Sequence, residues 1–349
     1  MNSFQATLVD RYRLTSPGSS KQTWYVELDV TGSGISFRPG DSLGVLPKNP
    51  PHRVDSLLDF FSLSREEIVC DPRTGCTVPV EKWLRCSVEL NRVSDKMASH
   101  FGEVGAGYDV ESFLKRVGAT EFNELIPLFI PMRPRLYSIA SGPSLRHHSI
   151  DLTVRQVVFE VAGRRGYGLC SHYLAQEAPL GSPEVEIFLQ PTNHFLFPEA
   201  GNKPVVMIAP GCGVAPFRAF LQEIEAGAIP STPCWLFFGE RHRETDFLYE
   251  DFWARHVSMG HLRVDTAFSR DQDQKCYVQH RMWEHRAELW RWIENGAKLY
   301  VCGDAKRMAK DVDHALISIA CDQGALSEAE AALFMRQLRA ERRYLKDVY

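Results

Sequence analysis

The chain has 349 residues, long enough for two domains of the usual size of roughly 100–200 residues each. Hydrophobic residues make up 44% of it and charged residues 24%, as in an ordinary globular protein. The net charge of −4 argues against a nucleic-acid partner, and no apolar run approaches the roughly 20 residues that span a bilayer. Because the first residues also lack the apolar core of a signal peptide, a cytoplasmic location is the simplest expectation.

Nine cysteines are scattered along the chain and form no CxxC pair. A zinc site would need such closely spaced ligands, so we expect no metal site. A disulfide framework is also not expected in a chain of this size in a reducing compartment. Most of the cysteines are therefore interpreted as small buried hydrophobic residues.

The first 198 residues have the pattern of a β-structure interrupted by a helical insertion. Strand-like alternation occurs at residues 23–30, and glycine and proline punctuate residues 32–47 as in a hairpin. Helical spacing prevails over about residues 50–132, including residues 51–69, 94–104 and 109–129. Strand patterns return at residues 135–141, 149–161 and 184–190.

Residues 199–349 alternate between strand and helix. Continuous apolar runs such as "VVMIA" (205–209) and "CWLFFGE" (234–240) are typical of buried parallel strands. Helical segments follow at residues 215–227, 246–257, 285–296 and 305–324, with further strands at 262–269 and 298–303. This order predicts a doubly wound parallel sheet, with the domain boundary between residues 198 and 199.

A glycine turn follows the first of these strands. Gly211, Cys212 and Gly213 lie between the strand and a helix, where glycine lets a ligand approach the backbone and a helix start attracts phosphate. The spacing differs from GxGxxG, because Pro216 stands where the third glycine would be. An ordinary tight strand–helix turn is the alternative.

Polar residues also follow a later strand. Ser269, Arg270 and Lys275 come after the strand at 262–269, at the edge where open α/β sheets bind ligands. A hydroxyl and two cations suit a phosphate monoester, and Tyr277 could stack on a purine. A solvated polar loop is the alternative.

Three other positions have a plain structural interpretation beside a functional one. Cys302 ends a strand, where it would face the ligand-binding edge of the sheet or be an ordinary packed residue. Gly168 and Ser171 precede a helix and would form an anion cradle, or an ordinary N-terminal cap. Tyr349 is the last residue, where chains usually fray, yet it is aromatic.

Taken together and in this order, these segments resemble the ferredoxin–NADP reductase-like FAD/NADP module of the diflavin reductases, most of all that of the sulfite reductase flavoproteins. The resemblance is strongest over residues 133–349 and rests on "RLYSIAS", "GLCSHYL", "IAPGCGVAPFRAFLQE", "WLFFGERHRETDFLYEDFW", "SRDQDQKCYVQ", "LYVCGDAKRMAKDV" and "ERRYLKDVY". It implies an antiparallel FAD-binding barrel with a helical insertion, followed by an NADP-binding α/β domain.

The resemblance implies a set of FAD contacts. Arg135 would pair with the pyrophosphate, Tyr137 would pack against the isoalloxazine ring, and Ser138 would place its hydroxyl near flavin N5. Tyr349 would stack over the flavin and move aside for the nicotinamide. The other residues expected at FAD are Leu136, Thr153, Val154, Arg155, Gly168, Leu169, Cys170 and Ser171.

The resemblance also implies an NADP site and a hydride-transfer site. Gly211, Cys212 and Gly213 match the turn under the pyrophosphate, so the phosphate-binding interpretation gains support. The pocket for the 2′-phosphate is matched by Ser269, Arg270, Lys275 and Tyr277, with Gln279 and Asp311 nearby. These charges favour NADPH over NADH. Ser138, Cys302 and Asp347 match the residues that line the hydride-transfer site, as groups that hydrogen-bond or stabilise charge rather than as nucleophiles.

Two departures from the family pattern stand out. Cys212 replaces the usual threonine of the turn, which removes a hydroxyl contact to the nucleotide. The flavodoxin-like FMN domain of the diflavin reductases does not precede the first strands. The expectation is that FMN resides on a separate protein, that electrons pass directly to an acceptor, or that this sequence is a fragment.

The sequence therefore predicts an NADPH-dependent FAD oxidoreductase. It would pass electrons to a protein acceptor, such as a sirohaem sulfite reductase, in a sulfite-reductase-like system. One alternative is a reductase for a free flavodoxin, ferredoxin or haem protein of another pathway. Another, of a different class, is a non-catalytic flavin-binding sensor or scaffold. The oligomeric state is left open.

Overall fold

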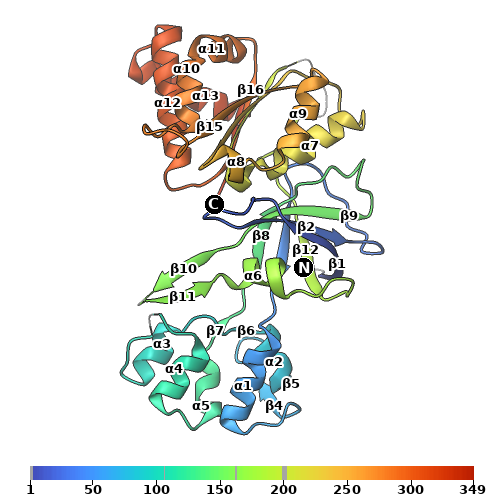
Figure 1. The fold of residues 1–349 in the computed structure, drawn as a ribbon, viewed down its shortest axis with the longest axis vertical. Coiled ribbons are helices and arrows are strands. Elements are labelled where there is room, and N and C mark those ends of the chain that lie inside the picture. Colours follow the sequence, from blue (N-terminus) through green and yellow to red (C-terminus); the bar gives the residue numbers. More distant parts are fainter. Residues whose placement is uncertain (1–2, 106, 162, 199–202) are drawn as a thin grey trace. The chain divides into compact units, whose positions relative to one another are not determined.

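The computed structural model describes residues 3–105, 107–161, 163–198 and 203–349 (Figure 1). Contacts divide the chain into two compact units. The first comprises Met1–Val9, Gly44–Leu136 and Val154–Phe188, and the second comprises Asp10–Leu43, Tyr137–Thr153 and Leu189–Tyr349. The domain boundary expected after residue 198 adjoins residues 199–202, which lie outside the described part of the chain, and it stays a prediction.

The first sheet is the expected barrel. Its strands, in spatial order, are β8 (Arg135–Ser138), β3 (Ser42–Leu46), β12 (Val185–Gln190), β1 (Phe4–Arg13), β2 (Thr23–Asp29) and β9 (Ser149–Arg155). An isolated antiparallel bridge joins Ile139, directly after β8, to Leu152 of β9. Because this bridge links the two ends of the strand order, the sheet closes on itself. The expected hairpin over residues 32–47 supplies only β3.

The helical insertion folds around its own core in the first unit. Its elements are α1 (Pro51–Phe61), β4 (Ile68–Cys70), β5 (Thr77–Pro79), α2 (Val80–Cys86), β6 (Val88–Glu89), α3 (Asp95–His100), α4 (Val110–Val117), α5 (Phe122–Leu125), η1 (Ile126–Leu128) and β7 (Ile130–Pro131). Buried Trp83 and Phe113 lie in its core. Side-chain caps start α3 and α4, where Ser94 and Asp109 accept backbone N–H bonds.

The helix predicted over residues 51–69 is wrong in its second half. α1 ends at Phe61, and Ser62 follows in the left-handed conformation with φ 55°. That conformation satisfies the last carbonyls of the helix and turns the chain away. The residues that continued the apolar spacing then form β4, which pairs with β5.

A hairpin and a short helix complete the first unit. β10 (Val158–Val161) pairs with β11 (Arg164–Tyr167) in antiparallel register. Then α6 (Leu169–His172) continues into a π-helical turn, η2 (Tyr173–Glu177). The turn between β11 and α6 contains Gly168, where sequence reasoning placed FAD contacts.

The second sheet is fully parallel, as predicted. Within the described residues its strands are β15 (Leu262–Phe268), β14 (Cys234–Glu240), β13 (Val205–Pro210), β16 (Lys298–Gly303) and β17 (Tyr344–Val348), in that spatial order. The order reverses at β13, so the carboxyl ends of β13 and β16 form the switch point where such sheets bind ligands.

Helices cover both faces of this sheet (Figure 1). On one face the core contains residues of α10 (Val278–Glu284), α11 (Arg286–Glu294), α12 (Met308–Gly324) and α13 (Glu328–Ala340). On the other it contains residues of α7 (Ala215–Glu225) and α9 (Glu250–Ser258). Val206 and Met207 illustrate the alternation, since these neighbours on β13 belong to opposite cores.

Sequence reasoning missed several elements of the second unit. It assigned no helix to α10, α13 or the short α8 (Arg243–Asp246), and it assigned no strand to the residues of β17. None of the helices in the described part of the chain is long and apolar enough to cross a membrane.

Candidate active site

Three residues far apart in the sequence meet in the second unit. The Ser138 hydroxyl donates a hydrogen bond of 3.1 Å to Oδ2 of Asp347, and the Cys302 thiol lies 4.0 Å from the same oxygen. This is the trio that sequence reasoning assigned to hydride transfer.

Parallel strand pairing holds two members of the trio side by side. Cys302 of β16 is directly paired with Asp347 of β17. Cys302 is fully buried, and Ser138 and Asp347 are partly buried. A strand that sequence reasoning did not assign therefore places the carboxylate of the site.

Burial sets the protonation of this trio. Burial raises the pKa of Asp347, while the Ser138 hydrogen bond and nearby His194 oppose the rise. Burial, followed by the neighbouring Asp347 charge, raises the pKa of the Cys302 thiol well above its usual value. The raised pKa favours the neutral thiol over a thiolate nucleophile, so hydrogen bonding and charge stabilisation are the roles that suit Cys302.

The C-terminal residue is anchored through its backbone. The Tyr349 N–H donates to Gly303 O at 3.0 Å, and its carbonyl accepts from Ala305 N at 3.1 Å. The side chain is nevertheless 67% exposed. The backbone of the last residue is therefore ordered although chain ends usually fray, and a large aromatic ring is presented at the carboxyl end of β16.

The glycine turn is shaped by two different constraints. Gly211 has φ +60°, a left-handed conformation that favours glycine. Gly213 is buried, and a Cβ atom there would lie 2.0 Å from the carbonyl oxygen of Cys302. The second glycine is therefore needed for packing against β16, and the turn η3 (Gly211–Val214) is held at the switch point. Cys212 between them is partly exposed.

The residues expected at the 2′-phosphate follow β15. Arg270 and Lys275 are exposed, and within the described residues neither side chain forms a hydrogen bond or ion pair. Such uncommitted cations are available to a phosphate. Tyr277 is 43% exposed at the start of α10, Ser269 directly follows β15, and Gln279 Nε2 lies 3.4 Å from Asp311 Oδ2.

The pyrophosphate residues expected for FAD lie in the first unit. Arg135 is exposed, and no partner for its guanidinium is found among the described residues. Leu136 beside it is 56% exposed.

The turn before α6 is built from its own hydrogen bonds. The Ser171 hydroxyl donates to Gly168 O at 3.0 Å and accepts from Val157 N at 3.0 Å. A Cβ atom on Gly168 would lie 2.9 Å from Cβ of Val157. The serine therefore shapes the turn, and the backbone N–H groups at the start of α6 are the donors suited to a phosphate. Leu169 and Cys170 are buried there.

The other residues expected at FAD differ in how far their side chains are buried. The Thr153 hydroxyl lies 2.7 Å from Tyr249 OH in a buried cluster, so its side chain is already engaged. Val154 is fully buried, Arg155 is exposed, and Tyr137 is partly exposed.

Sequence reasoning missed a large cavity in the first unit. It measures about 1450 Å³, and its lining includes Phe159, Tyr167, Arg133 and Arg165. Phe159 is 38% exposed on β10, and the Arg165 guanidinium lies 5.6 Å from the Tyr167 ring centre. Aromatic faces and cations together suit the adenosine and phosphate parts of a nucleotide. The apolar run at residues 157–159, between polar neighbours, was the signal in the sequence.

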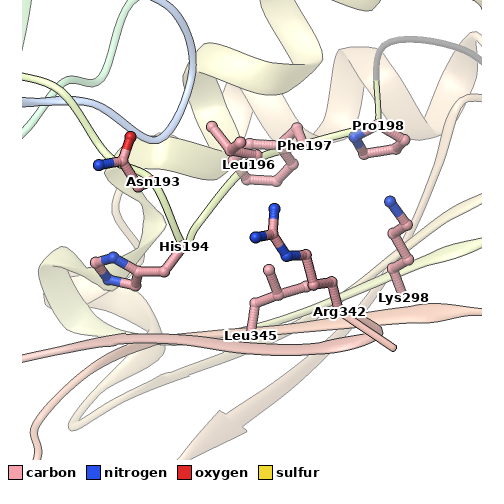
Figure 2. A pocket seen from close by; sticks show the side chains of 8 residues that line it. All are labelled: Asn193, His194, Leu196, Phe197, Pro198, Lys298, Arg342 and Leu345. Atoms are coloured by element: carbon pink, nitrogen blue, oxygen red, sulfur yellow. The ribbon is translucent and has the colours of Figure 1, made fainter. Parts of the chain in front are cut away.

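A smaller cavity of about 290 Å³ lies in the second unit at the amino ends of β16 and β17 (Figure 2). Lys298 and Arg342 extend their charged ends toward residues 196–198. Leu345 also lines it and precedes Asp347 by two residues on β17. The glycine turn Gly211–Val214 is at the opposite, carboxyl ends of the strands, so this cavity is separate from it.

The residues present therefore fit both ligands that the sequence predicted, FAD and a nicotinamide nucleotide. An unpaired arginine, a glycine turn and an aromatic-lined cavity suit FAD, and a switch-point turn with nearby free cations suits a phosphorylated nicotinamide nucleotide. Comparison with known families agrees, because residues 1–77 match the FAD-binding domain family and residues 207–314 match the oxidoreductase NAD-binding domain family. The chain therefore contains an FAD-binding domain and an oxidoreductase NAD-binding domain.

The chain is also similar over its full length to several curated proteins. The chain is 39% identical over its full length to the flavoprotein alpha-component of NADPH–sulfite reductase from Shewanella sp. (strain ANA-3), covering 61% of that protein. It is 37% identical to the protein of that name from Vibrio cholerae, over 99% of the chain and 59% of the relative, and 35% identical to that of Bacillus subtilis, over 100% and 61%. The chain thus spans about three fifths of the length of these relatives.

Proposed function

We propose that this protein is an NADPH-dependent FAD reductase that passes electrons to a protein acceptor, in a system like that of the NADPH–sulfite reductases. The observation that carries the proposal is the meeting of Ser138, Cys302 and Asp347 at the carboxyl ends of β16 and β17. A redox-inert binding module would have no need for a hydroxyl and a half-buried carboxylate held together there.

When bound, FAD supplies the capacity to accept a hydride from NADPH and to release the two electrons singly to a one-electron acceptor. Arg135 and the turn at Gly168 are proposed to hold its pyrophosphate, with Leu136 and Tyr137 against the cofactor. Arg155 would add a cation, while Thr153 and Val154 would contribute backbone only, since their side chains are buried.

The chain's own residues are proposed to orient the two reactants and to control charge. Gly211, Cys212 and Gly213 would lie under the nucleotide pyrophosphate. Arg270 and Lys275 would bind the 2′-phosphate, aided by Ser269, Tyr277, Gln279 and Asp311. Ser138 and Asp347 would share one proton between hydroxyl and carboxylate beside the site of hydride transfer, and the neutral Cys302 thiol would keep that site free of a competing anion.

The acceptor is proposed to be the haem-containing subunit of a sulfite reductase, because the relatives are named as the flavoprotein component of that enzyme. We also propose a cytoplasmic location. Seven cysteines among the described residues are free, and thiols persist in a reducing compartment; they are Cys70, Cys76, Cys86, Cys234, Cys276, Cys302 and Cys321.

Anaerobic stopped-flow mixing of the FAD-loaded protein with NADPH or NADH tests the proposal. Rapid bleaching of the flavin absorbance by NADPH and slow bleaching by NADH is expected. Protein that binds FAD but is bleached by neither nucleotide would overturn the reductase assignment and leave a binding module. Mixing the reduced protein with a sulfite reductase haemoprotein then tests the acceptor.

A further inference from the structure

One face of α7 carries three buried polar side chains. Arg218, Gln222 and Glu223 are 8%, 6% and 6% exposed. Arg218 and Gln222 lie one turn apart on the same side of the helix, and Glu223 directly follows Gln222. Burying such groups is unfavourable unless their hydrogen bonds are satisfied. The hydrogen-bond partners of these three side chains therefore indicate which part of the protein α7 holds in place.

Two of them bond to the segment that follows β8. Gln222 Oε1 accepts a bond of 2.7 Å from the Gly142 N–H. The Glu223 carboxylate accepts both the N–H of Ser144, at 2.8 Å, and its hydroxyl, at 2.7 Å. The helix thus satisfies consecutive donors of one short stretch of backbone.

The third adds a buried ion pair to the same segment. Arg218 Nη1 donates to Ala140 O at 2.5 Å and to Asp151 Oδ2 at 2.7 Å. Asp151 is fully buried on β9, accepts from Tyr25 OH at 2.9 Å, and its N–H donates to Ser141 Oγ at 2.9 Å. An arginine–carboxylate pair with this many bonds holds a defined geometry.

A glycine lets the segment lie directly against the helix. A Cβ atom on Gly142 would lie 2.5 Å from Glu223 Oε1 and 3.0 Å from Ala219 O. A methyl group on Gly142 would therefore displace the Glu223 carboxylate and press against the Ala219 carbonyl of α7.

Both partners of this contact lead directly to the proposed site. The segment at residues 140–144 begins two residues after Ser138, and α7 begins directly after the glycine turn Gly211–Val214. We infer that Arg218, Gln222 and Glu223, together the α7 clamp, are positioning residues that fix Ser138 relative to the nucleotide turn. The inference rests on the proposed function, because it assigns the clamp a role in aligning hydride donor and acceptor.

The expected effect is large because alignment dominates reactions of this kind. A displacement of roughly 1 Å between reacting groups can lower a rate by about 100-fold, even when both ligands stay bound. Loss of the clamp should therefore reduce the rate of flavin reduction at saturating NADPH while leaving the affinities for FAD and NADP⁺ nearly unchanged.

Two variants loosen the clamp in different ways. Gln222→Met keeps the side-chain length but removes the acceptor for Gly142, and Gly142→Ala forces the segment off the helix. Glu225→Gln is the matched control, because Glu225 is also on α7 but pairs with Arg255 on α9 at 3.0 Å and does not contact the segment. The full-length FAD-loaded proteins are compared by anaerobic reduction, by FAD and NADP⁺ titration, by thermal unfolding and by hydrogen exchange of residues 138–144.

For both clamp variants we expect at least ~10-fold slower reduction at saturating NADPH, cofactor affinities within about 3-fold of wild type, and faster amide exchange at Gly142 and Ser144. The control should match wild type in all of these. Unchanged exchange would overturn the clamp itself. Faster exchange with an unchanged reduction rate, or a fall in unfolding temperature alone, would overturn its positioning role. A wild-type protein that NADPH does not reduce would instead overturn the proposed function, and the exchange data would still show whether the clamp holds the segment.

Discussion

Ser138 and Asp347 are separated by 209 positions in the chain and are joined by a hydrogen bond of 3.1 Å. One residue ends a barrel strand and the other lies on the last strand of the parallel sheet. The proposed chemistry depends on this bond, because it holds a hydroxyl and a carboxylate of raised pKa at one point.

Replacing Ser138 by alanine should slow flavin reduction by about 10- to 100-fold, since a hydrogen bond to a charged group contributes about 1.5–3 kcal/mol. NADP⁺ affinity should stay within experimental error. Single-turnover reduction by NADPH measures the rate, and equilibrium titration measures the affinity. A rate equal to that of wild type would remove Ser138 from the site.

Asp347→Asn should change the pH dependence of stability. The folded pKa of Asp347 is raised by burial, so the folded state binds this proton more tightly than the unfolded state does. Its contribution to stability is therefore greatest below the unfolded pKa of about 3.9 and is lost as the pH rises through the folded pKa. Urea unfolding of both proteins at pH values from 4 upward measures their free energies of unfolding. The free energy of unfolding of wild type should fall relative to that of the asparagine variant as the pH rises. The same pH dependence in both proteins would contradict the raised pKa.

Arg270→Ala should weaken NADPH binding selectively. A charge-assisted hydrogen bond contributes about 1.5–3 kcal/mol, which corresponds to roughly 10- to 150-fold in affinity. NADH, which lacks the 2′-phosphate, should lose almost nothing. Arg336→Ala on α13 is the control for loss of charge, since Arg336 is also exposed but lies in another part of the second unit. Equal losses for the two nucleotides would remove Arg270 from the phosphate pocket.

Tyr349→Ala should ease access of the nicotinamide. The substitution removes the exposed ring but keeps the backbone bonds to Gly303 and Ala305. We therefore expect tighter NADP⁺ binding and less discrimination against NADH, measured by titration and by reduction with each nucleotide. Deletion of Tyr349 would also remove both backbone bonds, so an effect seen only on deletion would assign the role to the backbone rather than the ring.

Gly213→Ala should destabilise the protein. The new Cβ atom would lie 2.0 Å from the Cys302 carbonyl, and overpacking of this kind costs about 1–3 kcal/mol or more. Gly227→Ala is the matched control, because Gly227 has φ +71° and no atom near the added carbon. Its cost should be limited to the left-handed backbone, about 1–2 kcal/mol. Urea unfolding compares the two, and a smaller effect at Gly213 would contradict the packing argument.

Local sequence patterns were sufficient to predict many of the strands and helices of the second unit. The runs at β13, β14 and β16 are apolar throughout because strands buried on both faces have no polar side, and the helices between them have helical spacing. β17 was not predicted, because its own residues do not have a clear strand pattern. Its residues "YLKDV" look like a polar terminus, and only pairing with β16 makes them a strand. The end of α1 at Phe61 was also missed, because apolar spacing continues past the point where Ser62 turns left-handed.

By itself, the sequence determined the class of fold and the types of residue at each proposed site, since strand periodicity, glycine turns and clustered cations are local properties. The tertiary structure alone decided which of those residues meet. The register of β16 and β17 brought Asp347 to Cys302, and closure of the barrel placed the segment after Ser138 where α7 could bind it. Asp151 and Arg218 have no local signal at all, because a buried ion pair exists only where two distant elements exclude water together.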